Sequence, residues 1–454
     1  MKRYISTAGL VIASLLFTAC AGEEEDIFSE SAAERLNSVS DVYSARLEAA
    51  PNGWAMQLYP QNSDEYPEGC GYLLLMRFNA DHTVNVAMDN VLSDNSYTSD
   101  NSVWDIITDQ GPVLSFSTYN NCVHAFADPY DLIFTDSSAD YNDDESGTGM
   151  GGDWEFVIVD APEDASYMML KGKKRGTYNL LTPVEEGVDY ESYLADVKAF
   201  HSKMFSSSTP TFNVMCFADS LYKMTSASQG MPKIYPYNGD EVIDESFNPF
   251  LITRRGGEFY LRFRDAMTKN DVTVQEFKYD EEKDMFIATE DETCYIDGDN
   301  PLRFFLETLD NDTYKFSWAK SSEMSDAYAT YYTNLTDAFS SVKYTLNKLY
   351  LRTLNGKTFI RVEYKYKSGG MNRSGTNDYI FTYSSDDEGI TLQYKEPGST
   401  SAETMYNALP ALQELLSAMS GKWIVSAATT KFNLSTMKLT RADNSNIWFV
   451  ANRN

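Results

Sequence analysis

The stretch GYLLLMRFNADHTVNVAM at residues 71–88 contains the pattern that decides the fold class. Residues 72–78 and 83–88 are mostly apolar, and residues 79–82 between them are mostly polar. Two short apolar runs joined by a brief polar turn are typical of an antiparallel β-hairpin. The stretch therefore predicts two neighbouring strands, and much of the chain repeats the pattern.

The first half of the chain adds further short runs and two helical patterns. Ser31 and Glu34 have the spacing of a capping box, which predicts a helix that ends at Pro51-Asn52-Gly53. A second helix is predicted at about 189–205. Its spacing places four apolar residues on one face: Tyr193, Val197, Phe200 and Met204. Further strands are predicted at 54–59, 113–119, 154–159, 166–171 and 177–181.

The second half is again rich in strand patterns. A helix is predicted at about 402–420, and residues 320–350 fit helix and strand equally well. Strands are predicted at 258–264, 271–279, 285–289, 302–307, 313–318, 357–365, 378–383, 390–394, 423–425 and 447–450. The fold class is therefore mainly β with a few helices (α+β), in antiparallel β-barrel or sandwich-like modules.

Composition shifts divide the 454 residues into four parts. The Ser-rich run that ends at Pro210 separates the two β-rich parts. The division predicts a signal peptide at 1–19, an acidic tether at 20–28, an N-terminal β-rich domain with flanking helices at 29–205, and one or more C-terminal β-rich domains at 206–454.

The N-terminus has the organisation of a secretory signal. Lys2 and Arg3 precede an apolar stretch at 5–17, which is shorter than the roughly 20 residues of a bilayer-spanning helix. Thr18 and Ala19 then precede Cys20. This arrangement resembles the bacterial lipobox, which implies cleavage before Cys20 and lipid attachment to its sulfur. The alternative is an ordinary secretory peptide with an incidental cysteine.

An acidic run at 23–26 follows directly. It resembles the signal that sends lipoproteins of Bacteroidetes to the cell surface, and the alternative is a solvated, self-repelling linker. The resemblance implies a protein that is lipid-anchored in the outer membrane and exposed on the cell surface.

The net charge of −30 bears on the choice of partner. It disfavours nucleic acid and anionic lipid surfaces, because like charges repel. The 31 Tyr and 25 Phe provide ample core material, and Tyr-rich surfaces also suit carbohydrate binding.

Four cysteines remain once Cys20 is assigned to the lipid. An oxidising compartment permits disulfides, and the simplest pairing within domains joins Cys70 to Cys122 and Cys216 to Cys294. Free, buried thiols are the equal alternative. Because the sequence contains no C-x-x-C motif, it predicts neither a zinc ribbon nor a thioredoxin-like site.

A search for known catalytic and metal-binding motifs identifies no catalytic residue, metal ligand or cofactor site in this sequence. The three histidines include no H-E-x-x-H, and no Walker A or G-x-S-x-G sequence occurs. The loop at 136–153 is dense in Asp and Glu, which suits calcium, but it lacks EF-hand spacing and fits a solvated insert better. The basic cluster at 171–175 is interpreted as an exposed hairpin turn.

Several short segments of the sequence resemble a known family. They are SAAERLN at 31–37, APNGW at 50–54, the hairpin at 71–86, DQGPVLSFSTYN at 109–120, GGDWEFVI at 151–158 and LKGKKRG at 170–176. Together they resemble a family of Bacteroidetes surface lipoproteins known as domain of unknown function 4302. The resemblance implies a component of a nutrient-uptake locus, near porin-type partners, and it supplies no catalytic residue.

Three functional hypotheses follow. The first is a non-catalytic binding or accessory component of a nutrient-uptake system, acting on a glycan, peptide or cofactor with a porin-type partner. The second is a secreted hydrolase that acts on glycan or peptide. The third is a component of envelope assembly.

Overall fold

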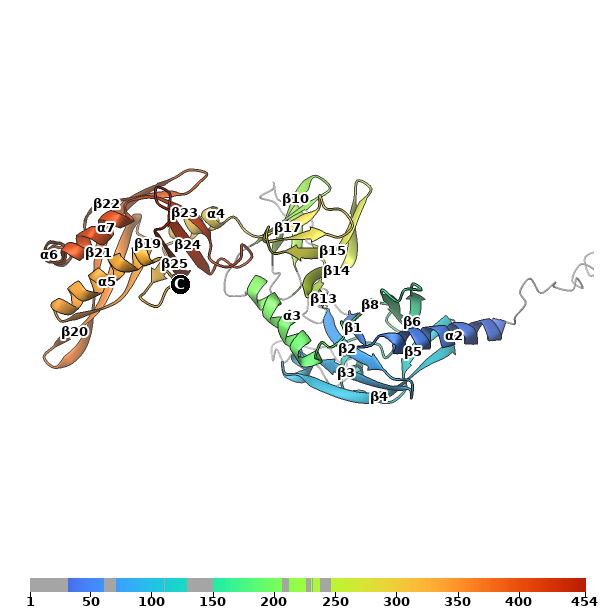
Figure 1. The fold of residues 1–454 in the computed structure, drawn as a ribbon. Coiled ribbons are helices and arrows are strands. Elements are labelled where there is room, and N and C mark those ends of the chain that lie inside the picture. Colours follow the sequence, from blue (N-terminus) through green and yellow to red (C-terminus); the bar gives the residue numbers. More distant parts are fainter. Residues whose placement is uncertain are drawn as a thin grey trace, which may run out of the picture.

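The computed structural model describes residues 32–60, 71–109, 111–128, 150–205, 212–225, 230, 232–236 and 246–454. The described strands form two closed barrels and one nine-stranded sheet. Figure 1 shows the N-terminal barrel (blue to green) and the C-terminal barrel (orange to red) at opposite ends, with the middle sheet between them. The predicted fold class is confirmed: the protein is mainly β, with antiparallel barrel-like modules and a few helices.

The N-terminal barrel contains eight strands, each antiparallel to its neighbours. They are β1 (Trp54–Leu58), β2 (Tyr72–Phe78), β3 (Thr83–Met88), β4 (Thr98–Asp109), β5 (Gly111–Phe116), β6 (Glu155–Asp160), β7 (Met168–Gly172) and β8 (Tyr178–Pro183). Two short 3-10 turns, η2 (Val91–Ser93) and η3 (His124–Ala127), lie in its loops. The barrel closes because β1 pairs with both β2 and β8.

The hairpin predicted at 72–88 is present as β2 and β3. Phe78 lies opposite Val84, so the two apolar runs pair in register. The turn is held by Asp81, whose carboxylate accepts from the Thr83 N–H at 3.0 Å. His82 adopts φ 61°, a left-handed conformation that short turns require.

The core of this barrel includes side chains from one strand that the sequence did not predict. Strand β4 was not predicted, because most of its residues are polar. Trp104 and Ile106 nevertheless alternate inward along it, and the Trp104 ring packs edge-on against Phe78 at 5.0 Å. Helix α2 (Ala32–Ala49) is joined to the barrel through Trp54, whose indole N–H donates to the Leu47 carbonyl at 3.0 Å.

Helix α3 (Tyr190–Met204) connects this barrel to the middle sheet. It begins at Asp189, whose carboxylate accepts from the Ser192 N–H, and its predicted apolar face is buried. At one end Tyr190 donates to the Asn52 carbonyl at 2.7 Å. One turn on, Tyr193 donates to the Arg254 carbonyl at 2.8 Å. The helix therefore contacts both modules.

The middle sheet has nine strands in the order β12-β11-β10-β9-β17-β16-β15-β14-β13. Their bounds are β9 (Asn213–Phe217), β10 (Ser220–Thr225), β11 (Lys233–Pro236), β12 (Ser246–Phe247), β13 (Phe250–Arg255), β14 (Glu258–Lys269), β15 (Val272–Asp280), β16 (Met285–Ala288) and β17 (Tyr295–Asp297). The strands predicted near 258, 271 and 285 are present, whereas β9 to β13 and β17 were not predicted.

The C-terminal barrel also has eight strands. They are β18 (Phe316–Trp318), β19 (Tyr344–Leu354), β20 (Lys357–Ser368), β21 (Met371–Ser385), β22 (Ile390–Pro397), β23 (Gly421–Ala427), β24 (Thr436–Arg441) and β25 (Trp448–Arg453). Its helices are α4 (Pro301–Leu309), α5 (Asp326–Ser341), α6 (Thr400–Ala408) and α7 (Pro410–Met419). Helices α5 and α7 contact each other, and they pack on β19 and β22 respectively.

Two predictions in this part were wrong. The apolar run at 302–307 is helical, because Asn300 caps the first turn and Pro301 occupies its first position. The predicted helix at 402–420 is two helices, because Pro410 cannot continue a helix through Leu409. The ambiguous stretch at 320–350 contains both α5 and the start of β19.

The C-terminal barrel is attached to the middle sheet through the loop between β23 and β24. Phe432 in this loop is 1% exposed, although it belongs to the neighbouring module. Its ring lies 5.4 Å from Phe286 and 5.8 Å from Phe205, edge-on to both. Phe432 is therefore part of the core between α3 and the middle sheet.

Backbone contacts hold the same loop in place. Lys431 donates its N–H to the Asp284 carboxylate at 2.7 Å, and its carbonyl accepts from the Asp299 N–H at 3.0 Å. A Cβ on Gly298 would lie 2.3 Å from the carbonyl carbon of Lys431, so only glycine permits this approach. The two modules thus meet through the buried Phe432 ring and through hydrogen bonds of the Lys431 backbone with the Asp284 carboxylate and the Asp299 N–H.

Candidate functional site

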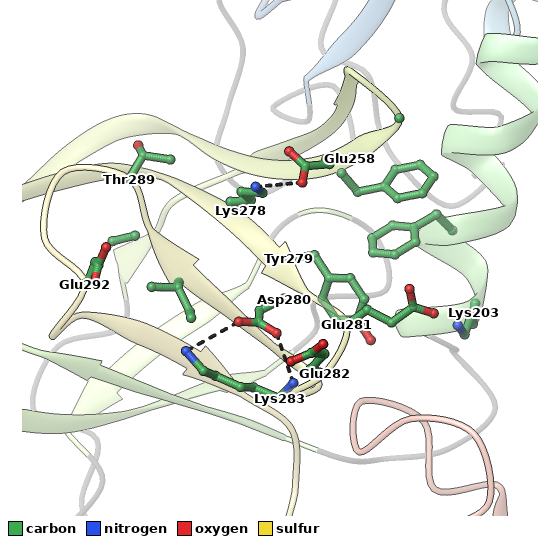
Figure 2. Close-up of a pocket in the computed structure, with 15 residues that line it drawn as sticks. Lys203, Glu258, Lys278, Tyr279, Asp280, Glu281, Glu282, Lys283, Thr289 and Glu292 are labelled. Atoms are coloured by element: carbon green, nitrogen blue, oxygen red, sulfur yellow. Dashed lines mark hydrogen bonds and ion pairs between the residues drawn. The ribbon is translucent and has the colours of Figure 1, made fainter.

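A cleft of about 740 Å³ opens on the middle sheet beside α3. Its walls come from α3, from the turn between β13 and β14, and from β15, β16 and the loops around them. Figure 2 shows the labelled side chains of Glu258, Lys278, Asp280 and Lys283 around this space, with dashed lines for their ion pairs. The lining combines aromatic rings with charges of both signs.

Aromatic rings form the wall at α3. Phe200 of α3 stacks on Phe259 of β14 with centroids 3.9 Å apart and planes 6° apart. Tyr279 packs edge-on against Phe200 at 5.2 Å. Stacked and edge-on rings contribute about 0.5–1.5 kcal/mol per pair beyond their buried area. The three rings therefore stabilise one another where α3 meets the sheet.

Two ion pairs cross the cleft lining. Lys278 lies 2.7 Å from Glu258, and this hydrogen bond lowers the pKa of Glu258 and raises that of Lys278. Lys283 lies 3.4 Å from Asp280. The pKa of Asp280 is lowered chiefly by the Lys283 N–H. Both carboxyl groups are ionised at neutral pH.

Further charged side chains on the lining are exposed. Lys203 lies on α3, while Glu281, Glu282 and Glu292 lie on the loops that flank β16. The lining thus combines cationic and anionic groups with an aromatic wall.

Tyr279 connects the cleft to the C-terminal barrel. Its hydroxyl donates to Asp284 at 2.9 Å, and Asp284 also accepts from the Thr430 hydroxyl at 2.7 Å. Burial and the neighbouring carboxylate raise the pKa of Tyr279, so the phenol remains a neutral donor. The loop that carries Phe432 therefore supports one wall of the cleft.

None of the described residues proposed for sites from the sequence lies in this cleft. Cys20 and Cys70 fall outside the described residues. Cys122 is buried in the N-terminal barrel as a free thiol, and burial raises its pKa to about 12. A thiol this resistant to ionisation is unreactive.

Cys216 and Cys294 are free thiols in the structure. Cys216 lies opposite Tyr295 in the β9–β17 pair, so Cys294 points to the other face of the sheet. A disulfide would have to cross the sheet, which its geometry does not allow without rearranging a strand. The structure thus favours the free-thiol alternative for this pair.

The acidic loop is only partly described, since residues 136–149 fall outside the described part. Asp153, its last carboxylate, is 5% exposed and accepts from the N–H groups of Lys174 at 3.0 Å and Arg175 at 2.9 Å. Burial nevertheless raises its pKa. Asp153 therefore anchors the basic β7–β8 turn, and its oxygens are already used.

Sequence reasoning missed the cleft altogether. The described residues contain no cluster of three or more His, Cys, Asp and Glu arranged to hold a metal ion. The only local signal was the charged run DEEKD at 280–284, which follows a strand. Such runs are common on solvated turns, so the signal was weak.

The family comparison matches more than half of the chain. Residues 24–281 match the family described as Domain of unknown function (DUF4302). The chain belongs to this family. The match ends just after β15, so the family segment excludes β16 and β17, although β17 completes the sheet by pairing with β9. The cleft lining extends across this limit.

Other comparisons add no argument about role. No curated protein matches the chain. Among solved structures, the DNA polymerase III beta chain of Streptococcus pneumoniae TIGR4 is 9% identical, with 92% of this chain and 97% of that chain covered and a TM-score of 0.12. The sliding clamp of Pseudomonas aeruginosa is 10% identical, with 93% and 97% covered and a TM-score of 0.12. Similarity this low supports neither fold nor function.

Within the described ranges, none of the helices combines the length and the hydropathy of a membrane-spanning segment.

His201 on α3 gives a pH-dependent prediction. Burial against Phe205 and Phe250 lowers its pKa from 6.5 to about 4. The unfolded chain therefore binds a proton at a higher pH than the folded chain. The stability that the folded state gains from keeping His201 neutral is fully present above pH 6.5 and is lost as the pH falls toward 4.

Between about pH 7 and pH 5, protonation of His201 in the unfolded chain should lower the free energy of unfolding of the wild type by about 2 kcal/mol. We therefore expect the free energy of unfolding of His201→Phe to fall by about 2 kcal/mol less over the same range. Urea unfolding at the two pH values measures this difference. Ser202→Ala, at an exposed neighbouring position of α3 that carries no titratable group, is the control and should leave the fall unchanged. An equal fall in wild type and His201→Phe would contradict the assignment.

Proposed function

We propose that the protein is a lipid-anchored, surface-exposed binding protein of the outer membrane that captures short peptides as an accessory component of a nutrient-uptake system. The anchor and tether at 20–28 support the location. The cleft beside α3 is the observation that supports the binding role. The implied delivery of the ligand to a porin-type partner is part of the same proposal.

Charge in the cleft favours a peptide as the ligand. A peptide carries an ammonium group, a carboxylate and side chains, which match the acidic groups, the lysines and the aromatic wall of this lining. A neutral glycan would offer hydroxyl groups to these side chains but no opposite charge, so it would not form the stronger charge-assisted contacts that the two termini of a peptide can form. The net charge of −30 disfavours nucleic acid.

The cleft gives less support to hydrolysis. A general acid at neutral pH needs a carboxyl group whose pKa is raised. Glu258 and Asp280 have lowered pKa values. Asp153 and Asp299 have pKa values raised by burial, but neither lines the cleft, and each is occupied by hydrogen bonds in its own module.

Charge reversal on the cleft lining tests the binding role. The lipid-free ectodomain, residues 21–454, would be titrated calorimetrically with tripeptides that have an aromatic central residue. We expect the double variant Lys203→Glu and Lys283→Glu to bind at least fivefold more weakly, about 1 kcal/mol, because the ligand carboxylate loses its partners.

The matched control is Lys365→Glu with Lys367→Glu on β20, which makes the same change in net charge far from the cleft lining. Equal weakening by both double variants would indicate a general charge effect. Absence of peptide binding by the wild-type ectodomain would contradict the proposal, and peptide cleavage would favour the hydrolase.

Substitution of Cys20 tests the anchor. We expect Cys20→Ser to abolish incorporation of labelled palmitate and to move the protein from the outer-membrane fraction to the soluble fraction, since each buried methylene contributes about 0.8 kcal/mol. Mass spectrometry of the native protein should show a lipid on Cys20. A native N-terminus with an unmodified thiol there would contradict the anchor.

A further inference from the structure

The hairpin of β20 and β21 extends beyond the rest of the C-terminal barrel, at the lower left of Figure 1. On one side, β21 pairs with β20 along the whole hairpin, as far as Met371 opposite Ser368. On its other side, β21 pairs with β22 only from Tyr379 to Ser385. No strand of the described chain pairs with the outer edge of residues 371–377. That part of β21 is therefore an open sheet edge.

A hydrogen bond at the end of this edge shows which backbone groups point outward. The Asp378 carbonyl accepts from the Gly398 N–H, which follows β22, at 2.7 Å. In an antiparallel sheet both backbone groups of a residue point to the same neighbouring strand, and successive residues alternate. The outward N–H and C=O groups beyond Asp378 therefore belong to Thr376, Ser374 and Asn372, which are all exposed residues.

The usual devices that protect a sheet edge are missing from this stretch. Residues 371–377 contain no proline or lysine, and they pair with β20 without a bulge. Helix α6 covers the stretch at its end, where the Asn377 amide donates to the Met405 sulfur at 3.3 Å. Residues 371–374 beyond it are exposed. Because β20 already holds the edge extended, a further strand would lose little entropy in ordering it.

The tip of this hairpin is basic, although the chain as a whole has a net charge of −30. Residues 364–377 contain Lys365, Lys367 and Arg373 and no acidic residue. Arg373 lies on β21 itself, opposite Tyr366, and is exposed. A strand added to the edge would place one of its own side chains directly beside Arg373. An acidic side chain at that position would form a charge-assisted contact.

We propose that the outer edge of β21 at residues 371–377 binds an extended, acidic segment of a partner protein by strand addition. An extended polypeptide supplies N–H and C=O groups at the spacing of a strand, so it can pair with all the outward groups of this edge at once. Charge disfavours a second copy of this chain as the partner. Pairing of two β21 edges about a twofold axis would bring two basic hairpin tips together.

The edge is separate from the cleft that we propose for short peptides. It lies on the C-terminal barrel, whereas the cleft lies on the middle sheet beside α3. Strand addition from Asn372 to Thr376 needs a segment as long as that stretch, which a tripeptide does not provide. Tripeptide titrations therefore report on the cleft alone, and the strand-addition site does not depend on their outcome.

The test titrates the lipid-free ectodomain calorimetrically with a seven-residue peptide of alternating glutamate and valine, blocked at both ends. We expect binding, together with slower hydrogen exchange of the Asn372, Ser374 and Thr376 amides. The same peptide with its three central amides N-methylated keeps its charge but cannot donate to the edge, and it should bind at least tenfold more weakly. A peptide of alternating lysine and valine should also bind at least tenfold more weakly.

Arg373→Glu should weaken binding of the acidic peptide at least fivefold. Lys357→Glu is the matched control, because it makes the same change in net charge at an exposed position at the other end of β20. Circular dichroism verifies folding, and Arg373→Gln replaces Arg373→Glu if the latter does not fold. No binding by the wild type, equal binding of the N-methylated peptide, equal weakening by both variants, or a dimer that protects the same amides without peptide would overturn the proposal.

Discussion

The insertion of Phe432 into the core beneath α3 is the contact on which the arrangement of the second half depends. One fully buried phenylalanine typically contributes about 3–5 kcal/mol when compared with alanine. Around it, Asp284 accepts hydrogen bonds from both Thr430 and Lys431. These bonds would be exposed to water if the ring left its place. The middle sheet and the C-terminal barrel are therefore expected to behave as one body.

This contact also explains why the family segment does not correspond to a structural unit. The family match ends at residue 281, yet the sheet needs β16 and β17 to connect β15 to β9. Phe432, from far beyond that limit, then covers part of the same core. Since Tyr279 hydrogen-bonds to Asp284, the peptide cleft that we propose also depends on residues from both sides of the limit.

The fold could be predicted from the sequence where local patterns dominate. The hairpin at 72–88 and the buried face of α3 follow from alternation, turn residues and helical spacing. The sequence does not reveal strand β4 because its outward positions are polar, and the apolar run of α4 predicts a strand unless Asn300 and Pro301 are recognised as a helix start. The cleft could not be predicted, because α3 and the β15–β16 turn are distant in sequence and only the folded sheet brings them together.

Hydrogen exchange followed by mass spectrometry tests the central contact most directly. The account predicts that Phe432→Ala speeds amide exchange in β16 and β17 at least tenfold, about 1.4 kcal/mol, because the core beneath them loses its ring. Strands β2 and β3 of the N-terminal barrel should exchange at the wild-type rate. Unchanged protection of β16 and β17 in the variant would contradict the claim that Phe432 joins the two modules.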